Sequence, residues 1–299
     1  MNIFARWRLL SLLLALLASL PAVQAQGVTK STLDRIREHG AIYVGHRETA
    51  IPFSYMIGND VVGYTMDLCD RIVDAVREKS AIPTLKVVRV PVTGSSRMLM
   101  LLTGAIDLEC GVTTNTKIRQ QMVAFSFTTF VSGVKAMVRT DVGIDRIPDL
   151  AGKVVVTTVG TTTDRLVNSV MTVRGITIRA KSAPTQEAFS MVLSRQADAF
   201  VMDDAILSGF LASSPDRPKL KLLEENFGFE PYGIALRKDD PDFKKLIDDT
   251  LSGMMKSGEM ERIYNKWFMS PIPPKNINLQ IPMSGMLKEL FRSPNDTGI

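Results

Sequence analysis

The sequence predicts an α/β protein with two similar lobes, each a mostly parallel sheet flanked by helices. Short runs rich in Val and Ile alternate with longer stretches that carry apolar residues at helical spacing. This alternation occurs once before residue 111 and again after residue 153. Strands joined through helices pair in parallel by right-handed crossovers, so each half of the chain should form its own sheet.

The first half is expected to contain three helices and three strands. Its first helix starts at Ser-Thr and ends at Gly40, and its second places Leu68, Ile72 and Val76 on one face. The β-branched runs between the helices are typical of buried strands. The expected helices span 31–40, 64–80 and 95–104, and the expected strands span 41–47, 85–92 and 105–111.

The second half repeats the pattern and ends in a helical region. One helix opens on threonines and closes on Gly175, and a turn at 239–241 precedes two helices that split at 257–258. The expected strands span 153–160, 176–182 and 197–203, and the expected helices span 161–175, 185–196 and 286–291, with one more strand and two helices within 230–268.

Residues 1–25 have the pattern of a secretory signal peptide. Arg6 and Arg8 precede an apolar run of 12 residues, and small residues before and at Ala25 predict cleavage after it. The apolar run is shorter than the ~18–20 residues of a membrane span, which argues against an uncleaved anchor helix. The residue directly after the expected cleavage site is Gln26 and not Cys, so we expect an exported protein without a lipid anchor.

Composition and charge exclude several classes of partner. The chain is 45% hydrophobic and 22% charged, which is typical of a globular protein. Loss of Arg6 and Arg8 lowers the formal net charge from +5 to +3, too little to indicate a nucleic acid or a membrane surface. Only His39 and His46 are available for a catalytic triad or a His-based metal site, so neither is expected.

Two cysteines, Cys69 and Cys110, remain in the exported chain. An oxidising compartment allows them to form a disulfide. Two buried free thiols would instead pack as small hydrophobic residues. The spacing of the pair does not decide between these alternatives.

Functional residues are expected where strands end. In open α/β sheets, ligands bind beyond the carboxyl ends of the strands, and two such lobes would leave a crevice between them. Topology alone therefore selects five segments: 45–48, 91–97, 111–119, 159–163 and 202–204.

Three arginines lie in or at the end of these segments: Arg47, Arg97 and Arg119. A single arginine is most often a solvated surface charge. Three at strand ends of one lobe favour a binding site, because the planar guanidinium fork fits a carboxylate. Several forks indicate a ligand with more than one negative group.

The second half offers groups for both ends of an amino acid. The helix that starts at "GTTTD" (160–164) presents free backbone N–H groups to an anion, although simple N-capping by threonine explains these residues equally well. Of Asp203 and Asp204, one could cap the next helix and the other could accept hydrogen bonds from an ammonium group. Arginine forks that face an acidic residue are typical of a zwitterion site.

Long stretches carry a resemblance to a known family. The clearest are "VGHRETAIPFSY" (44–55), "ECGVTTNTKIRQ" (109–120) and "YGIALRKDDPDFKKLIDDT" (232–250). Over about residues 31–296 the chain resembles the periplasmic amino-acid-binding proteins of ABC transporters, solute-binding protein family 3. It is closest to their glutamate/aspartate-binding branch.

The resemblance implies a two-lobe periplasmic-binding-protein fold of type II that closes on its ligand by a hinge. The hinge would lie near 130–134 and 230–234, where two chain segments cross between the lobes. The implied units are residues 27–131 plus 234–270 for lobe 1, residues 132–233 for lobe 2, and residues 271–299 for a tail that packs on lobe 1.

The resemblance also implies which residues bind the ligand's carboxylate groups. Arg119 matches the arginine that holds the α-carboxylate, and Thr114 matches the donor beside it. Two further threonines match groups that close on the same carboxylate, namely Thr161 and Thr162. The two arginines that grip the ligand's side-chain carboxylate are Arg47 and Arg97.

The α-ammonium would be held by Asp203, assisted by the backbone carbonyl of Val112. Three positions depart from the branch, which has Ser at the positions of Gly94 and Val112 and His near Thr185. The departures leave the α-amino-acid end intact and remove neutral donors from the side-chain end.

The function that the resemblance implies is capture of glutamate or aspartate for an ABC permease in the inner membrane. The protein would be a periplasmic monomer without cofactor or metal, and not an enzyme. One alternative is a dehydratase-like enzyme on the same fold, with Glu48 or Glu109 as its acid or base. Another is a ligand-sensing protein that acts on a receptor.

Overall fold

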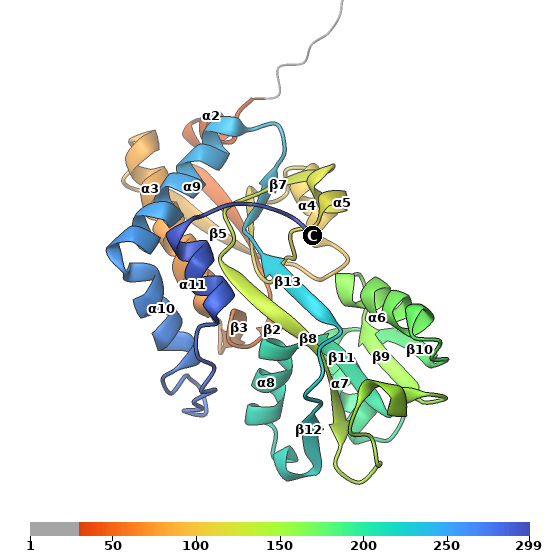
Figure 1. Cartoon of the computed structure of the whole chain (residues 1–299). Helices are drawn as coiled ribbons and strands as arrows, with labels where there is room; N and C mark the ends of the chain where they lie inside the picture. Colours follow the sequence, from red (N-terminus) through yellow and green to blue (C-terminus); the bar gives the residue numbers. More distant parts are fainter. Residues whose placement is uncertain (1–29) are drawn as a thin grey trace, which may run out of the picture. The chain divides into compact units, whose positions relative to one another are not determined.

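The computed structural model describes residues 30–299, and residues 31–299 form one compact unit. The expected signal peptide and its cleavage after Ala25 lie outside the described residues. Two large mixed sheets and one small sheet form the unit, with helices on the flanks (Figure 1). The expected α/β class is confirmed. In residues 30–299 no helix is long and apolar enough to cross a membrane.

The first sheet combines a parallel part with an antiparallel part. β1 pairs in parallel with β5 and β6, and β14 runs antiparallel between β6 and β7. The order is β5 (Lys86–Pro91), β1 (Ala41–His46), β6 (Leu108–Cys110), β14 (Ala235–Arg237) and β7 (Val123–Phe125). The three parallel strands are those expected from the first half, while the antiparallel strands bring residues 235–237 back beside residues 108–109.

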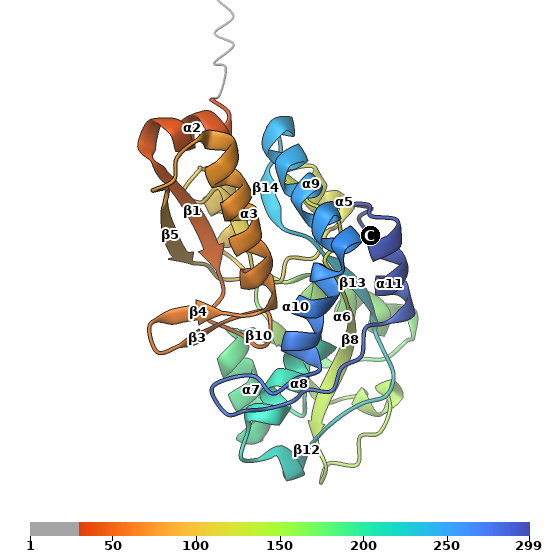
Figure 2. The ribbon, with the colours of Figure 1, turned by 90° about the vertical axis from the view of Figure 1, so that its left-hand side faces the viewer.

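Helices flank this sheet, and three of them pack against one another (Figure 2). They are α3 (Tyr64–Ser80), α9 (Pro241–Ser257) and α10 (Glu259–Phe268). The other helices from the first part of the chain are α2 (Thr32–His39) and α4 (Arg97–Leu102). α2 is capped as expected: the Ser31 hydroxyl accepts from the Asp34 N–H, and Gly40 ends the helix at a φ of 62°. α3 buries Leu68, Ile72 and Val76 along one face.

The second sheet is built from residues 130–232. β9 pairs in parallel with β10 and β11, as expected, and β8 adds antiparallel to β11. The order is β10 (Arg179–Ala183), β9 (Val154–Thr158), β11 (Ala199–Asp203), β8 (Phe130–Arg139) and β12 (Leu220–Leu222), with β13 (Gly228–Tyr232) also on β8. Its helices are α6 (Thr162–Val173), α7 (Thr185–Leu193) and α8 (Asp204–Ser213), and two 3-10 turns lie at Ile147–Leu150 and Arg217–Lys219.

The chain crosses between the two sheets at paired strands. β8 starts after β7, β14 starts after β13, and Tyr232 of β13 lies opposite Phe130 of β8. Phe130 stacks on Phe268 at 5.0 Å between ring centroids and meets the edge of Phe53 at 4.8 Å. This aromatic cluster ties both crossing segments to α10. The segments near 130–134 and 230–234 are those expected for a hinge, and the lobe boundaries stay a prediction.

Two features lie outside the alternating pattern. A three-stranded sheet follows β1, and the last residues form α11 (Gly285–Arg292) and an extended segment. α11 lies where a helix at 286–291 was expected. The small sheet consists of β2 (Thr49–Ala50), β3 (Ser54–Ile57) and β4 (Asp60–Val62).

Cys69 of α3 and Cys110 of β6 form a disulfide, which links a helix to the sheet that it covers. The two residues are 41 positions apart. Closing a loop of that length removes chain entropy worth about 4 kcal/mol from the unfolded state.

We expect the Cys69→Ser/Cys110→Ser double variant to lose about 2–4 kcal/mol of unfolding free energy, because its unfolded chain is no longer cross-linked. Urea unfolding with and without reductant measures this loss. Reductant should destabilise the natural chain and leave the double variant unchanged. Equal unfolding midpoints for the oxidised natural chain and the double variant would contradict the expectation.

Candidate functional site

The segments selected by topology lie at the carboxyl ends of parallel strands and come together. From the first sheet, an Arg97 guanidinium nitrogen donates to the Val112 carbonyl at 3.0 Å, and Arg119 donates to the Thr114 carbonyl at 2.9 Å. From the second sheet, the Thr162 hydroxyl lies 3.1 Å from the Thr114 hydroxyl. The contact between Thr114 and Thr162 joins the loop after β6 to the first turn of α6.

Three arginines carry positive charge into this region. Arg97 is only 2% exposed, Arg47 is also buried, and Arg119 is partly buried. Burial, reinforced by the charge of Arg97, lowers the pKa of Arg47 to about 10 and the pKa of Arg119 to about 10. Both therefore remain positive at neutral pH. Repulsion between buried cations is costly, and an anionic ligand would relieve it.

Three buried acids face these cations: Glu109, Asp203 and Glu230. One Glu109 oxygen accepts from the Thr113 hydroxyl at 2.6 Å, and its other oxygen has no hydrogen-bond partner among the described residues. The negative charges of Glu109 and Glu230 each raise the pKa of Arg119 and so favour its charged form.

Asp203 ends β11 and is 3% exposed. One of its oxygens accepts from the Tyr232 hydroxyl, and the other, Oδ1, is buried without a partner in residues 30–299. Burial, and then the charge of Glu230, raises the pKa of Asp203 well above its usual range. A buried carboxylate oxygen without a donor is suited to accept from a ligand.

The expectation that one aspartate caps the next helix is not met. Asp203 stands at the N-cap of α8 but makes no side-chain capping bond. Asp204 instead accepts from the Ser132 hydroxyl at 2.8 Å and from the Gly133 N–H at 3.1 Å. Asp204 thus holds the crossing strand β8, while Asp203 keeps an oxygen for the site.

Glu230 was predicted only as part of a hinge segment, and the structure gives it a central place. It is 1% exposed in β13, and one oxygen accepts from both threonine hydroxyls, Thr114 at 2.5 Å and Thr162 at 2.8 Å. The available signal was a lone acidic residue inside the returning strand "GFEPY". Its partners lie 116 and 68 positions away, so no local pattern could have named them.

The start of α6 presents backbone N–H groups rather than a capped terminus. Thr161 occupies the N-cap, but its hydroxyl donates to the Thr158 carbonyl at 2.7 Å and makes no capping bond. The N-capping alternative therefore does not describe Thr161. The first N–H groups of this 12-residue helix, beside Thr162, remain suited to an anion.

A cavity of about 320 Å³ continues the site between loops of the two sheets. Arg47, Gly94, Val159 and Thr185 are among the residues that line it. Gly94 has no room for a side chain, because a Cβ there would lie 2.8 Å from the Val159 carbonyl oxygen. Glycine at this position thus lets the loop before α4 touch the loop after β9.

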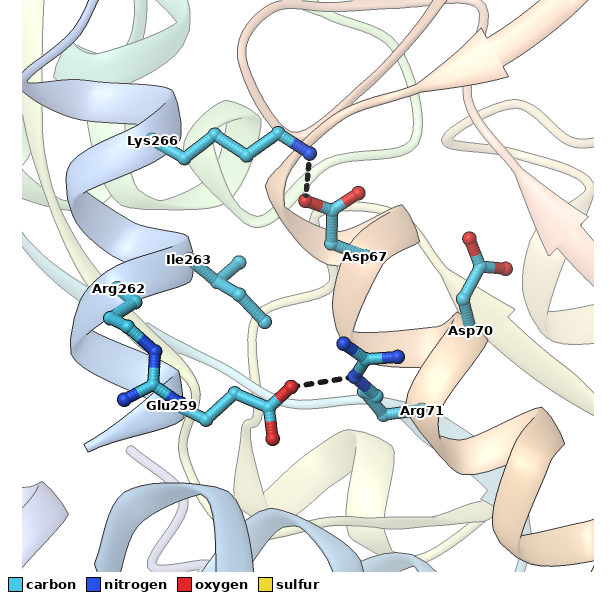
Figure 3. Close-up of a pocket in the computed structure, with 7 residues that line it drawn as sticks. All are labelled: Asp67, Asp70, Arg71, Glu259, Arg262, Ile263 and Lys266. Carbon is cyan, nitrogen blue, oxygen red and sulfur yellow. Dashed lines mark hydrogen bonds and ion pairs between the residues drawn. The ribbon is translucent and has the colours of Figure 1, made fainter. Parts of the chain in front are cut away.

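A second hollow of about 430 Å³ lies on the helical flank, between α3 and α10 (Figure 3). Its charges neutralise one another: Arg71 pairs with Glu259 at 2.6 Å, and Lys266 pairs with Asp67 at 2.6 Å. Because these side chains are paired with each other, the hollow offers little free charge to a ligand, and we place the binding site at the strand ends. Among residues 30–299 no group of three His, Cys, Asp or Glu residues could hold a metal ion.

Comparison with known proteins identifies the family of the chain. Residues 42–270 match the model of the bacterial extracellular solute-binding proteins, family 3. The chain belongs to this family. Relatives within it include the glutamate/aspartate import solute-binding protein of Escherichia coli, 42% identical over 96% of each chain. The L-glutamate/L-aspartate-binding protein of Pseudomonas aeruginosa is 40% identical over 95% of this chain and 94% of its own.

Among solved structures of similar fold is an ancestral arginine-binding protein bound to arginine. It has a TM-score of 0.68 and 31% identity, and the match covers 77% of this chain and 98% of that one. The relatives from Escherichia coli and Pseudomonas aeruginosa are both named as binding proteins, and the family-3 chain described here is a binding protein rather than an enzyme.

Proposed function

We propose that this protein captures glutamate or aspartate outside the cytoplasm and delivers it to an ABC permease. One observation carries the proposal: the buried Asp203, whose Oδ1 has no partner in the described residues, interacts electrostatically with Arg47 and Arg97, and Arg97 in turn with Arg119. An acidic amino acid carries two carboxylates and one ammonium group, which complement that arrangement. Relatives at 40–42% identity that are named for glutamate and aspartate support the same ligand.

The α-carboxylate is assigned to Arg119 and to the N–H groups at the start of α6, beside Thr161 and Thr162. The α-ammonium is assigned to Asp203 Oδ1 and the Val112 carbonyl. That carbonyl already accepts from Arg97 and has a second lone pair for the ligand. Thr114, whose hydroxyl meets that of Thr162, is assigned a place beside the α-carboxylate.

The ligand's side-chain carboxylate is assigned to Arg47, which lines the cavity, and to Arg97, whose charge acts on Arg47. Arg47 makes no side-chain hydrogen bond with the described residues, so its fork is available. Thr185, at the first turn of α7, lies at the far wall of the cavity and can contact a longer ligand.

Capture would use two lobes, residues 27–131 plus 234–270 and residues 132–233, that close about the paired segments of β8 and β13. Residues 271–299 would pack on the first lobe. Closure excludes water and so strengthens each charge-assisted hydrogen bond to the ligand. Export through a signal peptide cleaved after Ala25, and action as a monomer, complete the proposal.

The test is a thermal-shift screen of the twenty amino acids and of common dicarboxylates, followed by calorimetry. Glutamate and aspartate should raise the melting temperature most, because a ligand that binds only the folded state stabilises it. A shift with arginine or glutamine but none with either acid would overturn the acidic assignment.

Arg47→Met should weaken glutamate binding roughly 10- to 150-fold, because a hydrogen bond to a charged group contributes about 1.5–3 kcal/mol. Glutamine, which lacks the side-chain charge, should lose much less. Calorimetry with both ligands measures the ratio, and exposed Arg217→Met serves as the matched control. Equal losses for glutamate and glutamine would exclude Arg47 from the side-chain end.

A further inference from the structure

Arg119 lies on a helix that is too short to be stable by itself. α5 (Lys117–Gln120) has four residues, too few for a stable helix without outside support. The Thr116 hydroxyl caps it by accepting from the Arg119 N–H at 3.1 Å. The remaining support must come from other parts of the chain.

That support comes from the last residues of the sequence. The Lys117 N–H donates to the Ile299 carbonyl at 2.9 Å, and the Ile299 N–H donates to the Asn115 carbonyl at 3.2 Å. The Asn115 and Gln120 side-chain amides both donate to the Asp296 carbonyl, at 2.8 and 2.9 Å. These four bonds hold the segment 115–120, which is also bonded to strand β13: the Pro231 carbonyl accepts from the Asn115 N–H at 2.7 Å.

The segment 295–299, here called the brace, is itself fixed at its other end. The Thr128 N–H donates to the Asn295 carbonyl at 2.9 Å, and Asp296 pairs with Lys244 of α9 at 3.0 Å. Gly298 is buried, and a Cβ there would lie 3.0 Å from the Asn115 side-chain oxygen. Figure 1 shows the chain end beside α5. The brace therefore joins α5 to α9, and a larger residue at position 298 would crowd the side chains of Asn115 and Gln120.

We propose that the brace positions Arg119 for the ligand's α-carboxylate. The inference rests on the proposed function, because it gives a role to a segment that acts only through Arg119. The brace bonds to the backbone of Asn115 and Lys117 before Arg119 and to the side chain of Gln120 after it. The Arg119 guanidinium also donates to the Thr114 carbonyl. A fork that is held in place before the ligand arrives loses less conformational freedom on binding.

The first experiment compares the full chain with a chain that ends at Pro294. We expect glutamate and aspartate to bind the shortened chain at least about 10-fold more weakly by calorimetry. The two acids should lose equally, since the α-carboxylate is common to both. A second variant, Gly298→Val, retains every residue position of the brace but crowds the Asn115 side chain. Thr297→Val, at an exposed position of the brace, is its matched control.

A purely structural role is separated by repeating the truncation in an Arg119→Lys background. Lysine is a flexible point charge, so ligand binding by the Arg119→Lys variant should depend little on the brace. In that variant the truncation should weaken ligand affinity less than about 3-fold. Equal losses in both backgrounds, or unchanged affinity in the shortened chain, would overturn the proposal. If the full chain binds no amino acid, the proposed function fails instead, so the two failures are distinguishable.

Discussion

Arg119→Ala is expected to remove measurable binding of every amino acid, acidic or neutral. Its guanidinium donates to the carbonyl of Thr114, whose hydroxyl meets Thr162 in the first turn of α6, where the α-carboxylate is assigned. Truncating one partner of a buried charged pair costs about 2–5 kcal/mol, roughly a 30- to 5,000-fold loss in affinity. The upper end applies here, since the ligand's carboxylate would then sit beside Glu230 with less compensating charge.

Calorimetry with glutamate, aspartate and glutamine measures this loss. Arg217→Ala, an exposed arginine remote from the strand ends, is the control for loss of one positive charge. Melting temperatures of the ligand-free variants show that each one folds. Unchanged glutamate affinity in Arg119→Ala would refute both the site and the proposed mode of binding.

The second large effect is a fall in affinity as the pH falls. Burial, the charge of Glu230 and the charge of Asp204 raise the pKa of Asp203, while the Tyr232 hydrogen bond and Arg97 oppose them. Below that raised pKa, ligand-free Asp203 holds a proton that the ligand's ammonium must displace. Affinity should therefore decrease by up to about tenfold per pH unit as the pH falls through the pKa of Asp203, and become independent of pH above it.

Glutamate titrations between pH 5 and 8, in buffers of different ionisation enthalpy, measure both the affinity and the proton released on binding. The ligand's carboxylates titrate near pH 4 and below, and Arg47 and Arg119 near pH 10, so they contribute little in this window. Asp203→Asn should bind more weakly at neutral pH and lose the acid slope. An unchanged slope in Asp203→Asn would assign the proton to another group.

Helices and strands with local signals could be predicted from the sequence. α3 spans Tyr64–Ser80, the same residues as its apolar face predicted, because amphipathic spacing and a turn signal act within one segment. α8 (Asp204–Ser213) was expected only as the next helix after Asp203 and Asp204, without bounds, because "DAILSGFLAS" is apolar on most sides and so lacks the alternation that marks a surface helix. The antiparallel strands depend on partners far along the chain.

Residues of the candidate site also differ in whether the sequence alone could predict their roles. Arg47, Arg97 and Arg119 could be predicted from the sequence, because the rule that ligands bind beyond strand ends needs only the order of the elements. Glu230 could not be assigned its role, since its contacts form only when β13 returns between the two sheets. Thr161 looked like a helix cap, and only the fold shows that its hydroxyl turns to Thr158 instead.

The double hydrogen bond to Glu230 has a consequence for which molecules the site rejects. A threonine hydroxyl has one hydrogen, and Thr114 and Thr162 both give theirs to the same carboxylate oxygen. Toward the crevice they can offer only lone pairs. The buried Asp203 Oδ1, which has no partner in residues 30–299, is a further acceptor: a protonated amine would donate to it, whereas a 2-oxo group of equal size would place a second lone pair against it. The pocket would thus distinguish an amino acid from its own nitrogen-free carbon skeleton.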